Sequence, residues 1–164
     1  MDPEKLEIII VGKGQNTDSL VEEAIKLKEE AKRENKPYNQ VWCVFDRDSF
    51  PSQNFNRAIQ LARSKKIRCA YSNEAFEIWY LLHFEYFINA MSRTQYQDKL
   101  EPLLGHKYKK NSKTMYTELL DKQQNAIRNS KKLLLEYEHD NPAENNPSTK
   151  VFKLVEELNE RLKK

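Results

Sequence analysis

The stretch that decides the fold is Gln40-Val41-Trp42-Cys43-Val44-Phe45-Asp46-Arg47-Asp48. Five of its first six residues are apolar or aromatic, which is typical of a strand inside a parallel sheet. The run ends at Asp46, Arg47 and Asp48. The pattern predicts a buried strand at 40–45 whose carboxyl end carries two acidic side chains.

Strand-like and helix-like segments alternate around this stretch. Further apolar runs predict strands at 6–11 and 67–71, and apolar residues at helical spacing predict helices at 20–31, 55–62 and 76–82. Strands separated by helices of this length require crossover connections and form a parallel sheet. The predicted fold class is therefore α/β, a mostly parallel sheet flanked by helices.

The pattern after residue 87 predicts helices only, including a long polar helix to about residue 138 and a closing helix with an apolar stripe at 151–162. With 164 residues in total, one domain is expected overall. We expect a core at 1–87 and a helical C-terminal portion at 88–164 that packs on it.

Composition and charge exclude several classes of protein. No apolar run approaches the roughly 20 residues of a membrane span, and the first residues do not resemble a signal peptide, so a cytoplasmic protein without a membrane partner is expected. Cys43 and Cys69 lack zinc-ligand spacing, which disfavours a structural metal or a disulfide framework. The net charge of +3 is small, but residues 93–132 hold ten Lys/Arg against four Asp/Glu. The positive charge is concentrated in the helical half.

The acidic pair Asp46 and Asp48 is the sharpest candidate site. Ligands of open parallel sheets bind at the carboxyl ends of the strands. Because residues two apart in extended chain point the same way, both carboxylates are expected to face one hard cation. This predicts Mg²⁺ or Mn²⁺, which would orient a phosphodiester. The alternative is that both residues only end the strand and cap the next helix.

A second candidate follows the next strand, in Ser72–Phe84. Asn73 is placed to cap a helix, and Glu77 falls in its first turn near the same sheet edge. Glu77 is a candidate metal ligand or general base, and His83 is a candidate catalytic residue. Capping and packing alone are the alternative explanation for these residues.

A third candidate is the loop around Lys107, Tyr108, Lys109 and Lys110. Lysines meet phosphates and tyrosine stacks on exposed bases, so the loop is a candidate nucleic-acid contact if it lies beside the acidic edge. A solvated loop has the same composition. Gly12-Lys13-Gly14 matches no nucleotide-binding motif.

Three motifs, 41–48, 72–84 and 146–151, resemble the RloB-like family, which takes its name from genes linked to restriction–modification loci. That family is similar to topoisomerase–primase (Toprim) domains, and the resemblance covers nearly the whole chain. It implies a divalent metal held by a glutamate after the first strand and by an Asp-x-Asp after a later one, used to cut or join nucleic acid strands. Asp46 and Asp48 match the Asp-x-Asp. The other family positions are Asn73, Glu77, Trp79, His83, Asn146, Ser148 and Thr149.

The chain departs from the family at its start. Family members begin with a strand and a Glu-Gly-type turn that carries the first acid, and no such segment precedes Leu6. We therefore expect a version without the N-terminal strand. The leading hypothesis is a Toprim-like, metal-dependent nuclease or phosphodiesterase domain in phage defence. The alternatives are a non-catalytic module that binds nucleic acid or a partner, and an interaction protein whose last helix engages a partner or a second copy in a homodimer.

Overall fold

The structure is a computed structural model that describes residues 7–11 and 16–163. The first half contains α1 (Thr17–Arg33), β1 (Trp42–Asp46), α2 (Ser52–Ser64) and β2 (Arg68–Asn73). The second half contains α3 (Glu77–Leu81), α4 (Arg93–Leu104), α5 (Met115–Leu119), a 3-10 turn (Leu120–Lys122), α6 (Gln123–Leu134), β3 (Ser148–Thr149) and α7 (Val151–Leu162). The predicted α/β class is confirmed.

The sheet of the described residues has three strands in the order β1-β2-β3. β1 and β2 are parallel, with Asp46 opposite Ser72. β3 is antiparallel to β2, with Ser148 opposite Asn73. The sheet is therefore mixed, and the prediction of a mostly parallel sheet is corrected. β3 was not foreseen because two polar residues carry no strand periodicity.

The strand predicted at 6–11 is wrong for the residues that the structure describes. Residues 7–11 form no strand and are exposed, with Ile10 87% exposed. A β-branched run is stable as a strand only where a neighbour pairs with it and buries one face. Within the described part of the chain β1 is consequently an edge strand, and Val44 is 43% exposed instead of buried. Leu6 and Gly12-Lys13-Gly14 lie outside the described residues.

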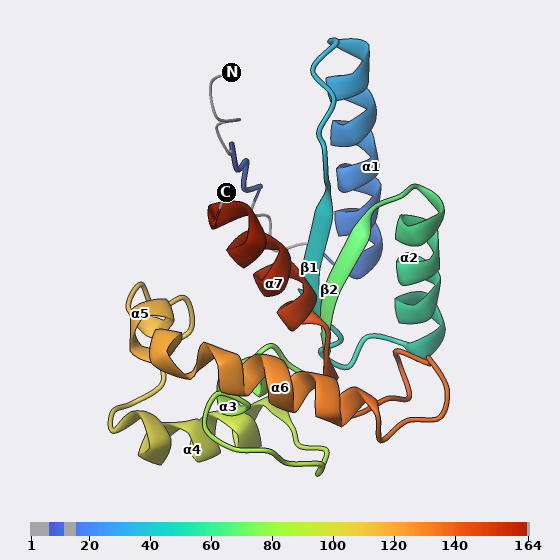
Figure 1. Cartoon of the computed structure of the whole chain (residues 1–164). Coiled ribbons are helices and arrows are strands. Elements are labelled where there is room, and N and C mark those ends of the chain that lie inside the picture. Colours follow the sequence, from blue (N-terminus) through green and yellow to red (C-terminus); the bar gives the residue numbers. More distant parts are fainter. Residues whose placement is uncertain (1–6, 12–15, 164) are drawn as a thin grey trace.

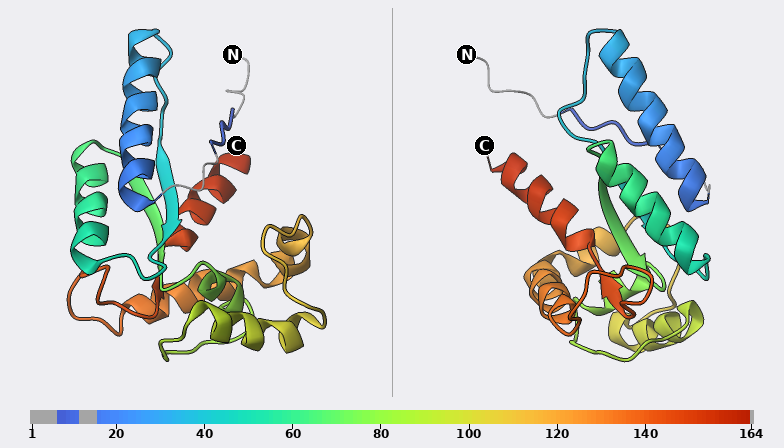
Figure 2. Two further views of the ribbon diagram at one scale, coloured as in Figure 1. Left: turned by 180° about the vertical axis from the view of Figure 1, so that it is seen from behind. Right: turned by 90° about the vertical axis from the view of Figure 1, so that its right-hand side faces the viewer.

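Helices cover the sheet from both sides (Figures 1 and 2). α1 and α2 lie over one face, where Val21, Cys43 and Ala58 are buried together. α7 packs on β2 and on α6 at the other face, with Val151 and Phe152 buried. Packing against β2 and α6 thus accounts for the first part of the apolar stripe that was predicted at 151–162.

The remaining helices gather at the carboxyl ends of β1 and β2 (Figure 1). Their core begins at Ala75 and includes fully buried Leu81, Tyr96 and Leu133. The long helix predicted to residue 138 is instead α5, the 3-10 turn and α6, which ends at Leu134. The boundary at residue 87 stays a prediction. Among the described residues, no helix combines the length and the apolar character of a membrane span.

Candidate functional site

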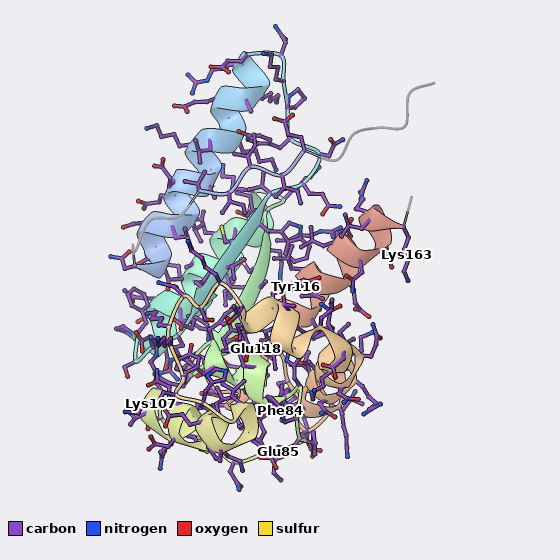
Figure 3. All side chains as sticks on the ribbon, turned by 90° about the vertical axis from the view of Figure 1, so that its left-hand side faces the viewer. Phe84, Glu85, Lys107, Tyr116, Glu118 and Lys163 are labelled. Atoms are coloured by element: carbon purple, nitrogen blue, oxygen red, sulfur yellow. The ribbon has the colours of Figure 1, made fainter. Side chains whose placement is uncertain are left out.

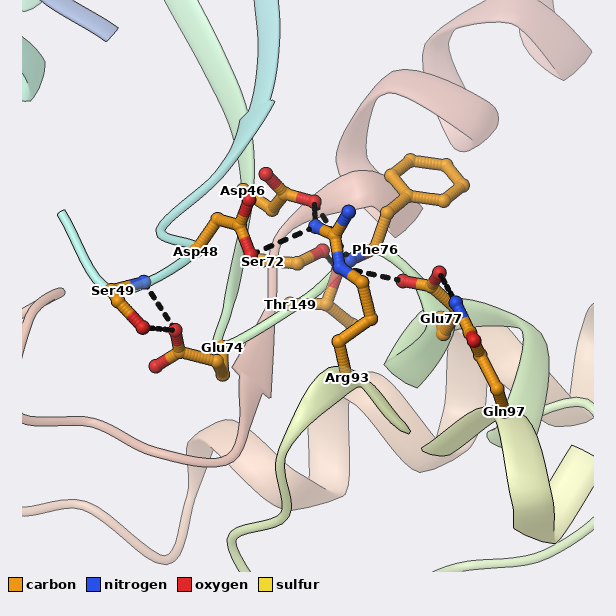
Figure 4. A network of polar contacts seen from close by, with 10 residues as sticks. All are labelled: Asp46, Asp48, Ser49, Ser72, Glu74, Phe76, Glu77, Arg93, Gln97 and Thr149. Atoms are coloured by element: carbon orange, nitrogen blue, oxygen red, sulfur yellow. Dashed lines mark hydrogen bonds and ion pairs between the residues drawn. The ribbon is translucent and has the colours of Figure 1, made fainter. Parts of the chain in front are cut away.

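Three carboxyl groups at the sheet edge converge on one guanidinium, that of Arg93 (Figure 4). Arg93 Nη2 lies 2.5 Å from Asp46 Oδ2 and 3.3 Å from Asp48 Oδ1. Arg93 Nε lies 3.8 Å from Glu77 Oε2. The carboxyl groups come from the end of β1, the following turn and the first residue of α3. We call Asp46, Asp48 and Glu77 the acidic cluster.

The turn after β1 brings Asp48 into the acidic cluster. β1 ends at Asp46, and both Asp48 (φ 44°) and Ser49 (φ 63°) have left-handed backbone. The Asp48 amide donates to the Glu74 carbonyl oxygen at 2.9 Å, and the Glu74 carboxylate accepts from the Ser49 amide and hydroxyl. The two aspartates therefore meet through a tight turn rather than through the extended-chain period that we expected. Such backbone is strained by about 1–3 kcal/mol per residue and is often found at functional sites.

α4 carries Arg93 to the acidic cluster. The helix starts with a capping box, in which Ser92 and Gln95 exchange side-chain and backbone hydrogen bonds. Arg93 is the first helical residue, and Gln97, one turn later, donates to Glu77 Oε1 at 3.0 Å. Neither Arg93 nor Gln97 was predicted from the sequence as a site residue. The Ser92-x-x-Gln95 pattern signals the helix start, but no local signal links this helix to Glu77.

The electrostatics of the cluster favour additional positive charge. Burial raises the pKa of the Asp46 carboxyl, while Arg93 and the Phe76 amide, 3.3 Å from Oδ2, act to lower it. Burial of Arg93 acts to lower its pKa, but the carboxyl groups of the cluster outweigh this and raise it. One guanidinium faces three carboxyl groups, so negative charge remains that a further cation would neutralise.

The donor atoms suit a hard divalent cation, but Arg93 lies among them. Carboxylate oxygens are the ligands that Mg²⁺ prefers. Within residues 7–11 and 16–163, no set of three His, Cys, Asp or Glu side chains is arranged to hold a metal ion. The guanidinium contacts each member of the acidic cluster, and an ion bound by the same oxygens requires Arg93 to move aside.

His83 lies in the core of the helical half. Its side chain is 4% exposed, Nδ1 is 2.9 Å from the Trp79 carbonyl oxygen, and its ring packs edge-on against the Trp79 ring. Burial lowers the pKa of His83, so the imidazole is neutral at pH 7. The hydrogen bond to the Trp79 carbonyl oxygen and the ring contact account for the position of this side chain. Its catalytic role stays a prediction.

Asn73 does not cap a helix, contrary to expectation. α3 starts at Glu77 without a side-chain cap. The buried Asn73 amide instead donates to the carbonyl oxygens of three residues in the loop before β3: Pro142 and Ala143 at 3.0 Å, and Asn145 at 3.3 Å. Asn73 therefore fixes the 139–147 loop to the end of β2.

The last family motif lies beside the same end of β2. The Ser72 and Thr149 hydroxyls are 2.8 Å apart, and the Ser148 hydroxyl donates to the Asn145 carbonyl oxygen at 2.6 Å. Asn146 lines a cavity together with Asp48 and Arg93. The structure thus brings the motif at 146–149 to the edge of the acidic cluster.

The 106–113 loop adjoins the acidic cluster. Tyr108 and Lys110 line a cavity that Asp46 and Glu77 also line. Lys107 and Lys109 are exposed, and Figure 3 labels Lys107 near α4. His106 Nε2 lies 2.7 Å from the Glu118 carboxylate, which ties the loop to α5. Tyr108 and Lys110 thus lie beside the acidic edge, as a nucleic-acid contact of this loop requires.

Comparison with known families matches residues 2–158 to the family described as RloB-like protein. Neither a curated protein nor a solved structure matches the chain.

Proposed function

Since the chain belongs to the RloB-like family, we propose that it is a Toprim-like, metal-dependent nuclease or phosphodiesterase domain that acts in defence against foreign nucleic acid. One observation carries the proposal: Asp46, Asp48 and Glu77, from the end of β1, the following turn and the start of α3, converge at the carboxyl end of a parallel strand pair. That is the edge at which α/β sheets bind ligands.

In this proposal Asp46 and Asp48 hold Mg²⁺ or Mn²⁺, and Glu77 ligates the ion or acts as a base. The bound ion would stabilise negative charge on the phosphodiester. Arg93 then leaves the carboxylates and binds a substrate phosphate, for which its planar fork of donors is suited. Gln97 keeps Glu77 in place through its hydrogen bond.

The loop that contains Lys107, Lys109 and Lys110 contacts the nucleic acid backbone in this proposal. Tyr108 and Lys110 already line a cavity with Asp46 and Glu77, so a strand bound to the loop reaches the acidic cluster. Each lysine that neutralises a phosphate makes binding more sensitive to salt.

A second candidate function is a non-catalytic module that binds nucleic acid through the basic helical half. The observation that favours it is the contact of Arg93 with all three carboxyl groups, because a guanidinium already neutralises part of their charge. This candidate predicts salt-sensitive binding that is indifferent to EDTA and survives loss of Asp46.

Titration of the protein with Mg²⁺ or Mn²⁺, measured by calorimetry, distinguishes the two proposed functions. We expect Mg²⁺ or Mn²⁺ to bind the wild-type protein and not the Asp46→Asn/Asp48→Asn variant. The matched control is Asp121→Asn/Glu160→Gln, which removes two exposed carboxylates outside the cluster. Equal heats for wild type and the Asp46/Asp48 variant remove the metal, and with it the nuclease proposal.

A further inference from the structure

A cavity of about 180 Å³ lies between the acidic cluster and the 106–113 loop. Its lining combines three aromatic rings with charged and polar groups. The rings are those of Phe76, Tyr80 and Tyr108; the other lining residues are Asp46, Glu77, Arg93, Lys110 and Asn111. This combination differs from an ordinary hydrophobic core, in which carboxyl and guanidinium groups do not gather among aromatic rings.

The three rings form a continuous aromatic wall. The Phe76 and Tyr80 rings pack edge to face with centroids 5.3 Å apart, and the Tyr80 and Tyr108 rings are tilted with centroids 6.3 Å apart. Each ring also packs against the core of the helical half and is only half-buried. The core therefore supports the rings from behind, while each also lines the cavity.

Tyr108 is held in position at its backbone. Its amide donates to Glu101 Oε1 on α4 at 3.1 Å. Burial raises the pKa of the phenol, and the Glu77 carboxylate raises it further, so the hydroxyl stays protonated at neutral pH. Tyr108 thus contributes a neutral ring rather than a nucleophile.

The polar lining supplies the groups that a nucleotide needs beside its base. Lys110 is a cation for a phosphate, and the Asn111 amide can donate to and accept from a base edge. The volume is small against the roughly 300–1,000 Å³ of sites for drug-sized ligands. It suits one base rather than a base pair.

We propose that this cavity binds one unstacked base of a single-stranded nucleic acid against Tyr80 and Tyr108, with the adjoining phosphate at Lys110. The inference rests on the proposed function only for its ligand class, nucleic acid, and adds that the substrate is single-stranded. A base paired within a duplex has its faces covered and cannot enter without being flipped out. Base stacking on an aromatic side chain is sequence-tolerant, so the site selects strandedness rather than sequence.

The test is fluorescence anisotropy in EDTA with a labelled 12-nucleotide strand, alone and as a duplex. We expect the single strand to bind more tightly. Tyr108→Leu keeps an apolar side chain against the core and is expected to weaken single-strand binding about fivefold to 150-fold, the range for loss of one stacked base. Tyr108→Phe restores the ring and should restore the binding. The control is Tyr116→Leu on α5, where the side chain is 63% exposed and outside the cavity lining.

Several results would overturn the inference. They are a preference for the duplex, an equal loss of single-strand and duplex affinity in Tyr108→Leu, and competition by a free mononucleotide as strong as that by the strand. A cleavage assay with Mg²⁺ separates the two proposals. Metal-dependent cleavage that ignores Tyr108 keeps the proposed nuclease and removes the base site, whereas Tyr108-dependent single-strand binding without cleavage does the reverse.

Discussion

Replacing Arg93 with methionine is expected to destabilise the protein in the absence of divalent metal and to make it more responsive to Mg²⁺. The substitution keeps much of the aliphatic stem but leaves the acidic cluster without its cation. Two unit charges 4 Å apart interact by about 4 kcal/mol at an effective dielectric constant of 20. Arg93 and Asp46 are each about a quarter exposed, which reduces this value. A hydrogen bond to a charged group contributes about 1.5–3 kcal/mol, so we expect the substitution to lower the free energy of unfolding by about 2–3 kcal/mol.

The same carboxylates then become available to a metal ion. Mg²⁺ at 100 times its dissociation constant stabilises the fold by about 2.7 kcal/mol, so it should restore most of the loss in the variant. In the wild type the ion competes with Arg93 for the carboxylates, so the stabilisation by Mg²⁺ should be smaller.

Urea unfolding followed by circular dichroism, in EDTA and in Mg²⁺ at pH 7, measures these differences. The accompanying shift in melting temperature in EDTA is roughly 4–12 °C for a chain of this size. The matched control is Arg57→Met, which removes an exposed pair with Asp18 at 3.2 Å and should cost less than about 1 kcal/mol. The reasoning is refuted if Arg93→Met is as stable as the wild type in EDTA. It is also refuted if Mg²⁺ stabilises both proteins equally.

Four further predictions concern other contacts. Because burial lowers the pKa of His83 below its ordinary 6.5, its contribution to stability is full above pH 6.5 and is lost as the pH falls toward the folded pKa; His83→Asn should flatten this part of the stability profile. His106, whose pKa is raised by its hydrogen bond to the Glu118 side chain, contributes with the opposite sign: its contribution is full below pH 6.5 and is lost as the pH rises through the folded pKa, and His106→Asn should remove this loss. Asn73→Ala removes three hydrogen bonds to the 139–147 loop, and we expect a loss of about 2–4 kcal/mol in urea unfolding; an unchanged midpoint contradicts the anchoring role. Replacing the lysines of the 107–110 loop with glutamine should reduce the slope of log affinity against log salt by up to about 3, and an unchanged slope excludes the loop from phosphate contact. These lysines are Lys107, Lys109 and Lys110.

Local pattern located most of the regular elements of the first half. α1, β1, α2 and β2 lie where apolar spacing predicted them, because burial of one face of a helix or strand is written into nearby residues. The same reasoning placed Asp46 and Asp48 at the end of a strand. It failed at 7–11, where a strand pattern has no paired neighbour in the described residues, and at β3, which is too short to show a period.

Tertiary structure alone decided what the acidic residues meet. Arg93 is 47 residues after Asp46, and only the packing of α4 on α3 brings its guanidinium to the acidic cluster. In the same way the chain path between α4 and α5 carries Tyr108 to Tyr80. Contacts of this kind join side chains whose spacing follows no helical or strand period, so no local pattern encodes them. They form because several elements bury their apolar faces together, and the polar groups at the rim are positioned by that packing.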